Sequence, residues 1–322
     1  MRARNDISAF VLRIFAFTAT ALALSAQPYG YVSNEMGNNI SVVNRATNAV
    51  VASIPVSSGA GLTGLALTPD GSYIYVAEQS MNSVAVISTS SNSVVATIPV
   101  GSAPVHVAIN PKGTKAYVAN SNSNNVSVIN TATNTVVDTI AVGSKPTGIT
   151  VSPDGTRVLV TNMLSSTLTV INTLTNSTYG TWWTNAGPNG VAYGPKGNNV
   201  YVVNQYANTV TVHTTFDGDI IHTISGFAAP NAVAVTPNGK FLYVTNGNSA
   251  SVSVVNLSTL QIVARIPTGL LPTSVAISSD GATAYVTNGY AYTLSEIDTS
   301  KNTVIANLQR VGIYPASIAL SH

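Results

Sequence analysis

The chain has 322 residues, of which 45% are hydrophobic and only 7% are charged, whereas about a quarter of the residues are charged in an average soluble domain. This hydrophobic content is sufficient for a sizeable core and excludes a disordered chain. Because the sequence has no cysteine, disulfides, thiolate metal sites and a cysteine nucleophile are excluded as well.

Residues 1–26 have the pattern of a secretory signal peptide. Arginines near the start give a positive region, and residues 14–24 form an apolar run that is too short to span a bilayer. Small residues follow, so we expect cleavage after Ala26, with Ala23 as the alternative position. A retained N-terminal anchor is the other interpretation. The sequence therefore predicts a secreted, periplasmic or cell-surface protein.

The net charge of the remaining chain is close to zero. The full chain carries +2, but three arginines and one aspartate lie within residues 1–26, which leaves ten basic and ten acidic residues. Recognition of nucleic acid requires a basic stripe, so we expect no nucleic-acid partner. No later segment is long and apolar enough for a transmembrane helix, so we expect no membrane span in the mature chain.

Residues 27–322 consist of one unit repeated seven times. The motif Tyr-Val-x-Asn, or a close variant, begins at positions separated by 44 residues once and then by 42 residues each time: Tyr31, Tyr75, Tyr117, Leu159, Tyr201, Tyr243 and Tyr285. A fixed period of this length indicates a repeat architecture. Seven units account for almost all of residues 27–322, which we therefore predict to be a single domain.

Each unit contains four short runs rich in β-branched residues. In the third unit these runs are residues 105–110, 115–120, 126–130 and 135–142, and their alternation predicts β-strands. A Pro-Lys-Gly turn at residues 111–113 separates the first two runs, with Pro fixing φ and Gly permitting positive φ. Four antiparallel strands per unit, without helices, are typical of a β-propeller blade.

The two ends of the repeat region predict how the ring closes. The first run after the leader, residues 29–34, corresponds to the second strand of a unit, and the last run, residues 315–320, corresponds to a first strand. We therefore expect the C-terminal strand to complete the N-terminal blade, because such closure removes exposed sheet edges. The predicted fold is an all-β, seven-bladed propeller of four-stranded antiparallel blades.

The repeat resembles the YVTN family of β-propeller proteins, which is named after the motif Tyr-Val-Thr-Asn. The full motif stands at residues 243–246 and 285–288, with Pro-Asp-Gly at 153–155 and Val-x-Val-Ile-Asn at 126–130. The resemblance covers residues 29–322. It implies a seven-bladed propeller of the exported or surface-layer-like kind, and it implies location and shape more than a particular chemistry.

Two departures from the repeat point to a polar site at one end of the channel. If strands A to D run outward from the axis, the B–C and D–A loops share one face, beside the channel mouth. Glu78 replaces the motif Asn in the second blade, and His106 replaces the Gly, Ala or Ser of the other blades in the third. Together with Lys145 in the next loop, they could act as general acid and base. Drift among repeats at a wet channel mouth is the alternative.

Apolar and aromatic side chains of the same face form a second candidate site. They could stack on sugars or hold a peptide, or they could simply cover the ends of the blades. The candidate ligand-binding residues are Tyr206, Phe227, Leu270, Leu271, Tyr290, Tyr292 and Tyr314.

These features favour an exported, non-enzymatic and monomeric scaffold that binds a protein, glycan or cell-surface polymer at the cell envelope. We expect no metal and no cofactor, because His106, His213 and His222 are too scattered for a copper or haem centre. Two alternatives stay open. One is an enzyme of lactonase or lyase type built on Glu78 and His106, and the other is a docking partner of a periplasmic redox enzyme.

Overall fold

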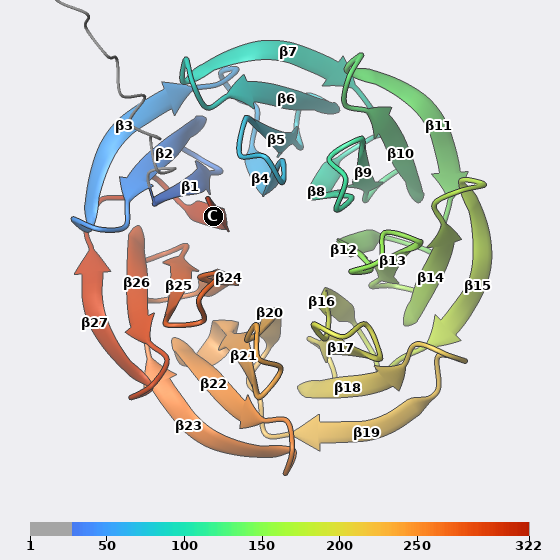
Figure 1. The fold of residues 1–322 in the computed structure, drawn as a ribbon, viewed down its shortest axis with the longest axis vertical. Helices are drawn as coiled ribbons and strands as arrows, with labels where there is room; N and C mark the ends of the chain where they lie inside the picture. The colour runs from blue at the N-terminus through green and yellow to red at the C-terminus, as the bar shows by residue number, and fades with distance from the viewer. Residues whose placement is uncertain (1–27, 322) are drawn as a thin grey trace, which may run out of the picture.

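The strand pattern of the repeat is present in every unit. The computed structural model describes residues 28–321, and these residues form seven four-stranded antiparallel sheets arranged as blades around a central axis (Figure 1). The only helical element of the described residues is the 3-10 turn η1, Gly247–Ser249. The structure thus confirms the predicted all-β, seven-bladed propeller. The predicted signal peptide, residues 1–26, lies outside the described residues.

The two inner strands of each blade have the following bounds. Strand A, next to the axis, is β4 (Leu62–Leu67), β8 (Pro104–Ile109), β12 (Pro146–Val151), β16 (Pro188–Tyr193), β20 (Pro230–Val235), β24 (Pro272–Ile277) or β28 (Pro315–Leu320). Strand B is β1 (Tyr29–Asn34), β5 (Tyr73–Glu78), β9 (Lys115–Asn120), β13 (Arg157–Asn162), β17 (Asn199–Asn204), β21 (Phe241–Asn246) or β25 (Thr283–Asn288).

The two outer strands complete the sheets. Strand C is β2 (Asn39–Asn44), β6 (Ser83–Ser88), β10 (Asn125–Asn130), β14 (Thr167–Asn172), β18 (Thr209–Thr214), β22 (Ser251–Asn256) or β26 (Thr293–Asp298). Strand D is β3 (Ala49–Pro55), β7 (Ser93–Pro99), β11 (Thr135–Ala141), β15 (Ser177–Trp183), β19 (Ile220–Ser225), β23 (Gln261–Pro267) or β27 (Thr303–Leu308). We call the sheet β28-β1-β2-β3 blade 1, and blades 2 to 7 follow in chain order from β4–β7 to β24–β27.

The ring is closed by the last strand of the chain. Strand β28 pairs antiparallel with β1, with Gly30 opposite Leu320, so the red C-terminal strand lies beside the blue N-terminal strand in Figure 1. The N–H of Tyr29 donates to the Ser321 hydroxyl at 2.9 Å, and the Ser321 N–H donates to the Tyr29 carbonyl at 2.8 Å. The prediction that blade 1 is shared by both ends of the chain is confirmed.

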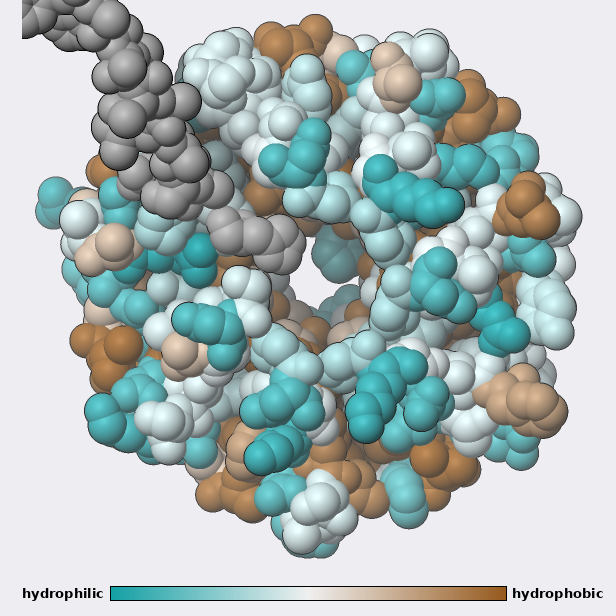
Figure 2. All heavy atoms as spheres, viewed as in Figure 1, coloured by the Kyte–Doolittle hydropathy of each residue, from teal (hydrophilic) through white to brown (hydrophobic). Residues whose placement is uncertain are grey.

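The hydrophobic core lies between neighbouring blades. For example, Ile40 and Ile54 of blade 1 pack with Leu62 and Ile74 of blade 2 in one buried cluster. Strands B and C are buried along most of their length, whereas strand D alternates and exposes residues such as Val51. Accordingly, Figure 2 shows hydrophobic side chains at the outer rim and an opening at the centre of the ring. The blades therefore stabilise one another and leave the axis open.

Strand A is irregular where it begins. Its first residue is Pro in six of the seven blades, and Pro has no N–H to donate to the ladder. The register with strand B shifts directly after this residue, as between Pro146 and Ile149 in blade 4. A bulge of this kind redirects side chains. The second and third residues of strand A are thereby placed at the axis.

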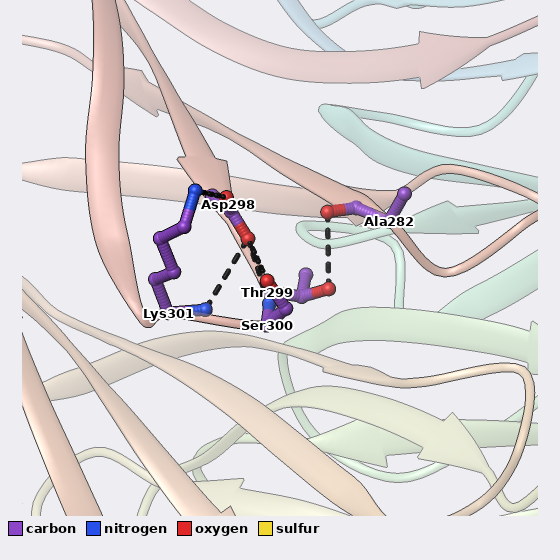
Figure 3. A network of polar contacts seen from close by, with 5 residues as sticks. All are labelled: Ala282, Asp298, Thr299, Ser300 and Lys301. Carbon is purple, nitrogen blue, oxygen red and sulfur yellow. Dashed lines mark hydrogen bonds and ion pairs between the residues drawn. The ribbon is translucent and has the colours of Figure 1, made fainter.

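The turns on the opposite face are closed by side-chain hydrogen bonds, as Figure 3 shows for blade 7. Asp298 accepts hydrogen bonds from the N–H of Ser300 at 2.9 Å and from the ammonium of Lys301 at 3.0 Å. Hydrogen bonds from Ser300 and Lys301 hold the pKa of Asp298 well below its usual range. The hydroxyl of Thr299 donates to the Ala282 carbonyl at 3.0 Å. These contacts join the C–D turn of blade 7 to its A–B turn.

Candidate functional site

The channel mouth is built by one hydrogen bond that recurs around the ring. The residue after the motif Asn donates its N–H to the carbonyl of the residue that precedes strand A, as from Gln79 to Gly61 at 3.1 Å and from Met163 to Lys145 at 2.9 Å. The accepting residue has positive φ, which is 55° for Lys145. The B–C and D–A loops therefore share one face, as predicted, and the loop backbone fixes which side chains reach the axis.

A cavity of about 500 Å³ lies at this mouth. It is lined by the second and third residues of the A strands together with the residue after the motif position in blades 2 to 5. The lining includes four amide side chains and three of the predicted residues, one of which is a tyrosine. These are Gln79, Asn189, Gln205, Asn231, Tyr206, His106 and Lys145.

The amide side chains form a connected group in blades 5 and 6. Both the Nε2 of Gln205 and the Nδ2 of Asn189 donate to the Oδ1 of Asn231, at 3.0 Å and 3.1 Å. Beside them the ring of Tyr206 lies over Gly187, where an added Cβ would come within 2.6 Å of the ring. The hydroxyl of Tyr206 donates to the Met163 sulfur at 3.4 Å. The group is thus held in position before any ligand binds.

His106 lines the same cavity from β8. An added Cβ at Gly64 would come within 2.7 Å of the His106 Cα, so the glycine of blade 2 gives this part of β8 the room to pack. Burial lowers the pKa of the His106 imidazole to about 4, and the ring is therefore neutral at pH 7. A neutral imidazole can accept a proton or a hydrogen bond from a ligand.

Glu78 does not take part in this cavity. Its side chain is fully buried, and its Oε2 accepts a hydrogen bond from the Ser83 hydroxyl at 2.7 Å. Its other oxygen has no hydrogen-bond partner among the described residues. The motif position is buried against strand C of its own blade, whereas the next residue, Gln79, lines the cavity. The structure therefore brings His106 and Lys145 to one cavity but does not add Glu78, and the predicted three-residue arrangement is not formed.

The predicted aromatic surface is present in blades 6 and 7. The rings of Tyr290 and Tyr314 meet edge to face, with 5.5 Å between centroids. Leu270 and Tyr292 are exposed beside the same loops, whereas Leu271 is half-buried. These side chains form an apolar rim outside the cavity lining.

The other two residues assigned to this surface have different positions. Tyr206 is 58% exposed and belongs to the cavity lining. Phe227 is only 7% exposed and packs in the core between blades 5 and 6 with Leu242. The assignment of Phe227 to a ligand-binding surface is therefore wrong, because this hydrophobic loop residue is buried by the neighbouring blade.

The amide group of Gln79, Asn189, Gln205 and Asn231 was not predicted from the sequence. The departures from the repeat that were predicted to form a site lie at the motif Asn and at the third residue of strand A. The amides stand one position after the motif Asn and at the second position of strand A. Comparing those two positions across the seven units would have found them.

Metal binding finds no support in the described part of the chain. Within residues 28–321, no group of three or more His, Asp or Glu side chains could hold a metal ion. In the same residues, no helix is long and apolar enough to cross a membrane.

Two family models match the sequence. The model described as "Lactonase, 7-bladed beta-propeller" matches residues 13–139 and 172–310. The model described as "YNCE-like beta-propeller" matches residues 107–223. No curated protein matches the chain. The name of the YVTN repeat family is not among these matches, so that finer resemblance stays a prediction.

Several solved structures have the same fold. Hydrazine synthase of Kuenenia stuttgartiensis is 24% identical with a TM-score of 0.77, over 84% of this chain and 92% of that one. A protein of unknown function from Desulfotomaculum acetoxidans is 20% identical with a TM-score of 0.81, over 91% and 99%. A protein of Bacteroides uniformis, described provisionally as a 6-phosphogluconolactonase, is 16% identical with a TM-score of 0.78, over 92% and 100%. At these identities the likeness shows the fold alone.

Proposed function

The chain belongs to the family of seven-bladed lactonase-type β-propellers, and from this premise we propose that it binds a carbohydrate at the mouth of its central channel without converting it. The lining of the cavity supports this proposal more than the family name does, since one propeller fold serves many activities. We further propose, from the predicted leader, that binding takes place outside the cytoplasm.

The observation that carries the proposal is the group of amides around the cavity. Gln79, Asn189, Gln205 and Asn231 line a volume of about 500 Å³, which is in the range of small-molecule sites. An amide both donates and accepts hydrogen bonds, as a sugar hydroxyl does. The partly exposed ring of Tyr206 offers an apolar face on which a sugar ring can stack.

The charges of the cavity favour binding over catalysis. Hydrolysis of a glycosidic bond commonly uses two carboxyl groups, but none of the described residues that line the cavity is Asp or Glu. Glu78, the carboxyl group predicted for this site, is fully buried and accepts a hydrogen bond from Ser83 of its own blade. Lys145 supplies one positive charge, so a carbohydrate with an acidic group would bind better than a neutral one.

A second candidate function is hydrolysis of a lactone in the same cavity. It is favoured by the presence of His106 and Lys145 in one lining. The neutral imidazole of His106 would take a proton from water as the water oxygen bonds to the lactone carbonyl carbon, and the ammonium of Lys145 would stabilise the resulting oxyanion. The ring C–O bond would then break, with the proton passing from His106 to the leaving oxygen.

A glycan-binding assay with matched variants tests the proposal. We expect Gln205→Ala and Tyr206→Ala each to weaken the binding of an acidic oligosaccharide by about tenfold, because each removes a direct contact. Gln309→Ala, which changes an exposed glutamine outside the cavity lining, should bind normally. Equal binding by all variants would reject the carbohydrate site.

Lactone turnover is measured on the same proteins. The assay follows acid release from glucono-δ-lactone at constant pH. Turnover that is lost in His106→Gly, which introduces the residue of blades 2, 4 and 5, would replace the binding proposal by the enzymatic one. Turnover no faster than in buffer would leave binding as the function of the cavity.

A further inference from the structure

A second cavity lies on the opposite face, between blades 4 and 5. Its volume is about 630 Å³, and it is lined by the A–B turns of both blades and the C–D turn of blade 5. In Figure 1 these are the turns β12–β13, β16–β17 and β18–β19. This cavity shares no residue with the one at the channel mouth.

The lining departs from the repeat in two ways that are specific to blade 5. The last residue of strand A is aliphatic in six blades, but in blade 5 it is Tyr193. The third residue of the C–D turn is Ala, Ser or Leu in the other blades, but in blade 5 it is Phe216, which is 90% exposed. Both side chains line the cavity, so the departures converge at one place.

Tyr193 contributes an unsatisfied polar group. Its hydroxyl is buried and has no hydrogen-bond partner among the described residues. A buried hydroxyl without a partner lowers stability, and an aliphatic residue, as in the other blades, would avoid that loss. A ligand atom that accepts a hydrogen bond would satisfy this hydroxyl.

Arg157 places a positive charge at the same cavity, and some of its guanidinium N–H groups make no hydrogen bond to the described residues. Its Nη1 donates to the Thr215 carbonyl at 2.6 Å, and its Cζ lies 5.2 Å from the centroid of the Tyr179 ring. In blade 3 the equivalent Lys115 reaches two acceptors of the next turn, the Thr173 carbonyl and the Asn176 side chain.

Blade 5 lacks the second of these acceptors, because Gly218 stands where blade 4 has Asn176. Arg157 is thus fixed in position, and no described residue accepts a hydrogen bond from its Nη2 or Nε. The guanidinium can therefore donate to a ligand.

The remaining charges leave the cavity positive. Lys196 is exposed at the tip of the A–B turn, and no ion pair to it is present among the described residues. Asp154 also lines the cavity, but its carboxylate already accepts hydrogen bonds from Ser152 and Thr156. The hydrogen bond from Ser152 is the main cause of a lowered pKa for Asp154. The cavity lining thus has two cationic side chains, Arg157 and Lys196, and one carboxylate, Asp154, which is already hydrogen-bonded.

We propose that this cavity is a binding site for a small aromatic carboxylate. The carboxylate would accept hydrogen bonds from Arg157 and the Tyr193 hydroxyl and would lie near the charge of Lys196. The flat ring of the ligand would pack on Phe216. A cavity of this size is large enough for such a molecule. The site is independent of the carbohydrate site, because it opens on the other face.

Binding of 4-hydroxybenzoate to the full chain tests the site, measured by calorimetry and by saturation-transfer NMR. We expect saturable binding, and we expect Lys196→Gln, Phe216→Ser and Tyr193→Phe each to weaken it by about fivefold or more. Phe216→Ser introduces the residue of blades 2, 6 and 7, and Lys112→Gln removes the equivalent lysine of blade 3. We expect Lys112→Gln to bind like the unchanged chain.

Two comparison ligands identify what is recognised. The amide 4-hydroxybenzamide keeps the ring without the charge, and inorganic phosphate keeps a charge without the ring; both should bind at least about fivefold more weakly. Equal binding of either compound would overturn the proposal, as would equal weakening by Lys112→Gln. Absence of saturation up to about 10 mM 4-hydroxybenzoate, which would mean binding energy below about 3 kcal/mol, would overturn it as well.

Discussion

Glu78 is a buried carboxyl group at a position where the other six blades have an asparagine. In those blades the Asn Nδ2 donates to a Ser or Thr hydroxyl seven residues later, as from Asn120 to Ser127 at 2.9 Å. In blade 2 both partners differ, because the residue seven positions after Glu78 is Ala85. The carboxyl group is left with Ser83 as its hydrogen-bond donor and with one unsatisfied oxygen.

Restoring the repeat at both positions should therefore stabilise the fold. We expect the double variant Glu78→Asn with Ala85→Ser to raise the free energy of unfolding by about 1–2 kcal/mol, since it replaces a buried carboxyl group by a neutral amide and adds one buried hydrogen bond. Equilibrium denaturation in urea measures the change. Glu78→Asn alone should give part of the gain. A double variant less stable than the natural chain would mean that Glu78 has a partner which the described residues do not supply.

At the scale of elements, a large side chain of strand β15 packs against a glycine of the β18–β19 turn. Trp182 stands where five other blades have Ile, and Gly218 stands where five other blades have Asn with positive φ. An added Cβ at Gly218 would come within 2.2 Å of the Trp182 ring, and the same ring stacks on His213 at 6.4 Å between centroids. The large side chain of blade 4 therefore requires the glycine of blade 5.

This fit predicts strong coupling between the two positions. Gly218→Asn should destabilise the chain by about 2 kcal/mol or more through overlap with Trp182, and Trp182→Ile should cost about 2–4 kcal/mol through the cavity it leaves. The double variant has the Ile and Asn of most other blades. We therefore expect its loss in free energy of unfolding to be at least about 1 kcal/mol smaller than the sum of the losses of the two single variants. Thermal and urea denaturation of all three variants measure the coupling energy. Trp183→Ala, at a residue that is 73% exposed, is the control, and its change in the free energy of unfolding should add to that of Gly218→Asn. If the changes caused by Trp182→Ile and Gly218→Asn also add, the proposed fit is refuted.

The same elements show how far the sequence predicts the structure. The strands of the third unit were expected at 105–110, 115–120, 126–130 and 135–142, and each begins and ends within one residue of that range. Alternation and turn residues are local properties, so they can be recognised in one unit and checked in six others.

The residues at the candidate site are positioned by contacts between blades and between loops, and the sequence of a single repeat unit does not reveal these contacts. Whether Glu78 or Gln79 lines the cavity depends on the hydrogen bond from the Gln79 N–H to the Gly61 carbonyl and on the register shift after Leu62 in strand A. The burial of Phe227 is decided by the blade that packs against it. The sequence therefore predicted which face of the propeller carries the candidate site, but it did not predict most of the polar residues that line the channel mouth.

At the scale of the whole molecule, closure by a shared sheet should be the main barrier to opening the ring. Circular permutation tests this role of the shared sheet. Joining Ser321 to Pro28 through an added Pro-Asp-Gly segment would copy the A–B turn at residues 152–156 of blade 4. New chain ends can then be placed in another loop. A permutant opened between Ser58 and Gly59 would have seven complete blades, with no strand shared between its ends. A permutant opened between Lys112 and Gly113 would share blade 3 as the natural chain shares blade 1.

We expect the permutant opened between blades to have a melting temperature lower by about 5 °C or more, while the one opened within blade 3 stays near that of the natural order. In the first, blades 1 and 2 are held together by side-chain packing and by hydrogen bonds such as that from the Ser33 hydroxyl to the Thr63 carbonyl. Their separation therefore breaks no β-ladder and gains the freedom of two chain ends. In the second, any opening must break the pairing of β8 with β9 or separate two covalently linked blades. Differential scanning calorimetry compares the two, and both lose a single loop connection. Equal melting temperatures would show that contacts between blades close the ring without help from the shared sheet.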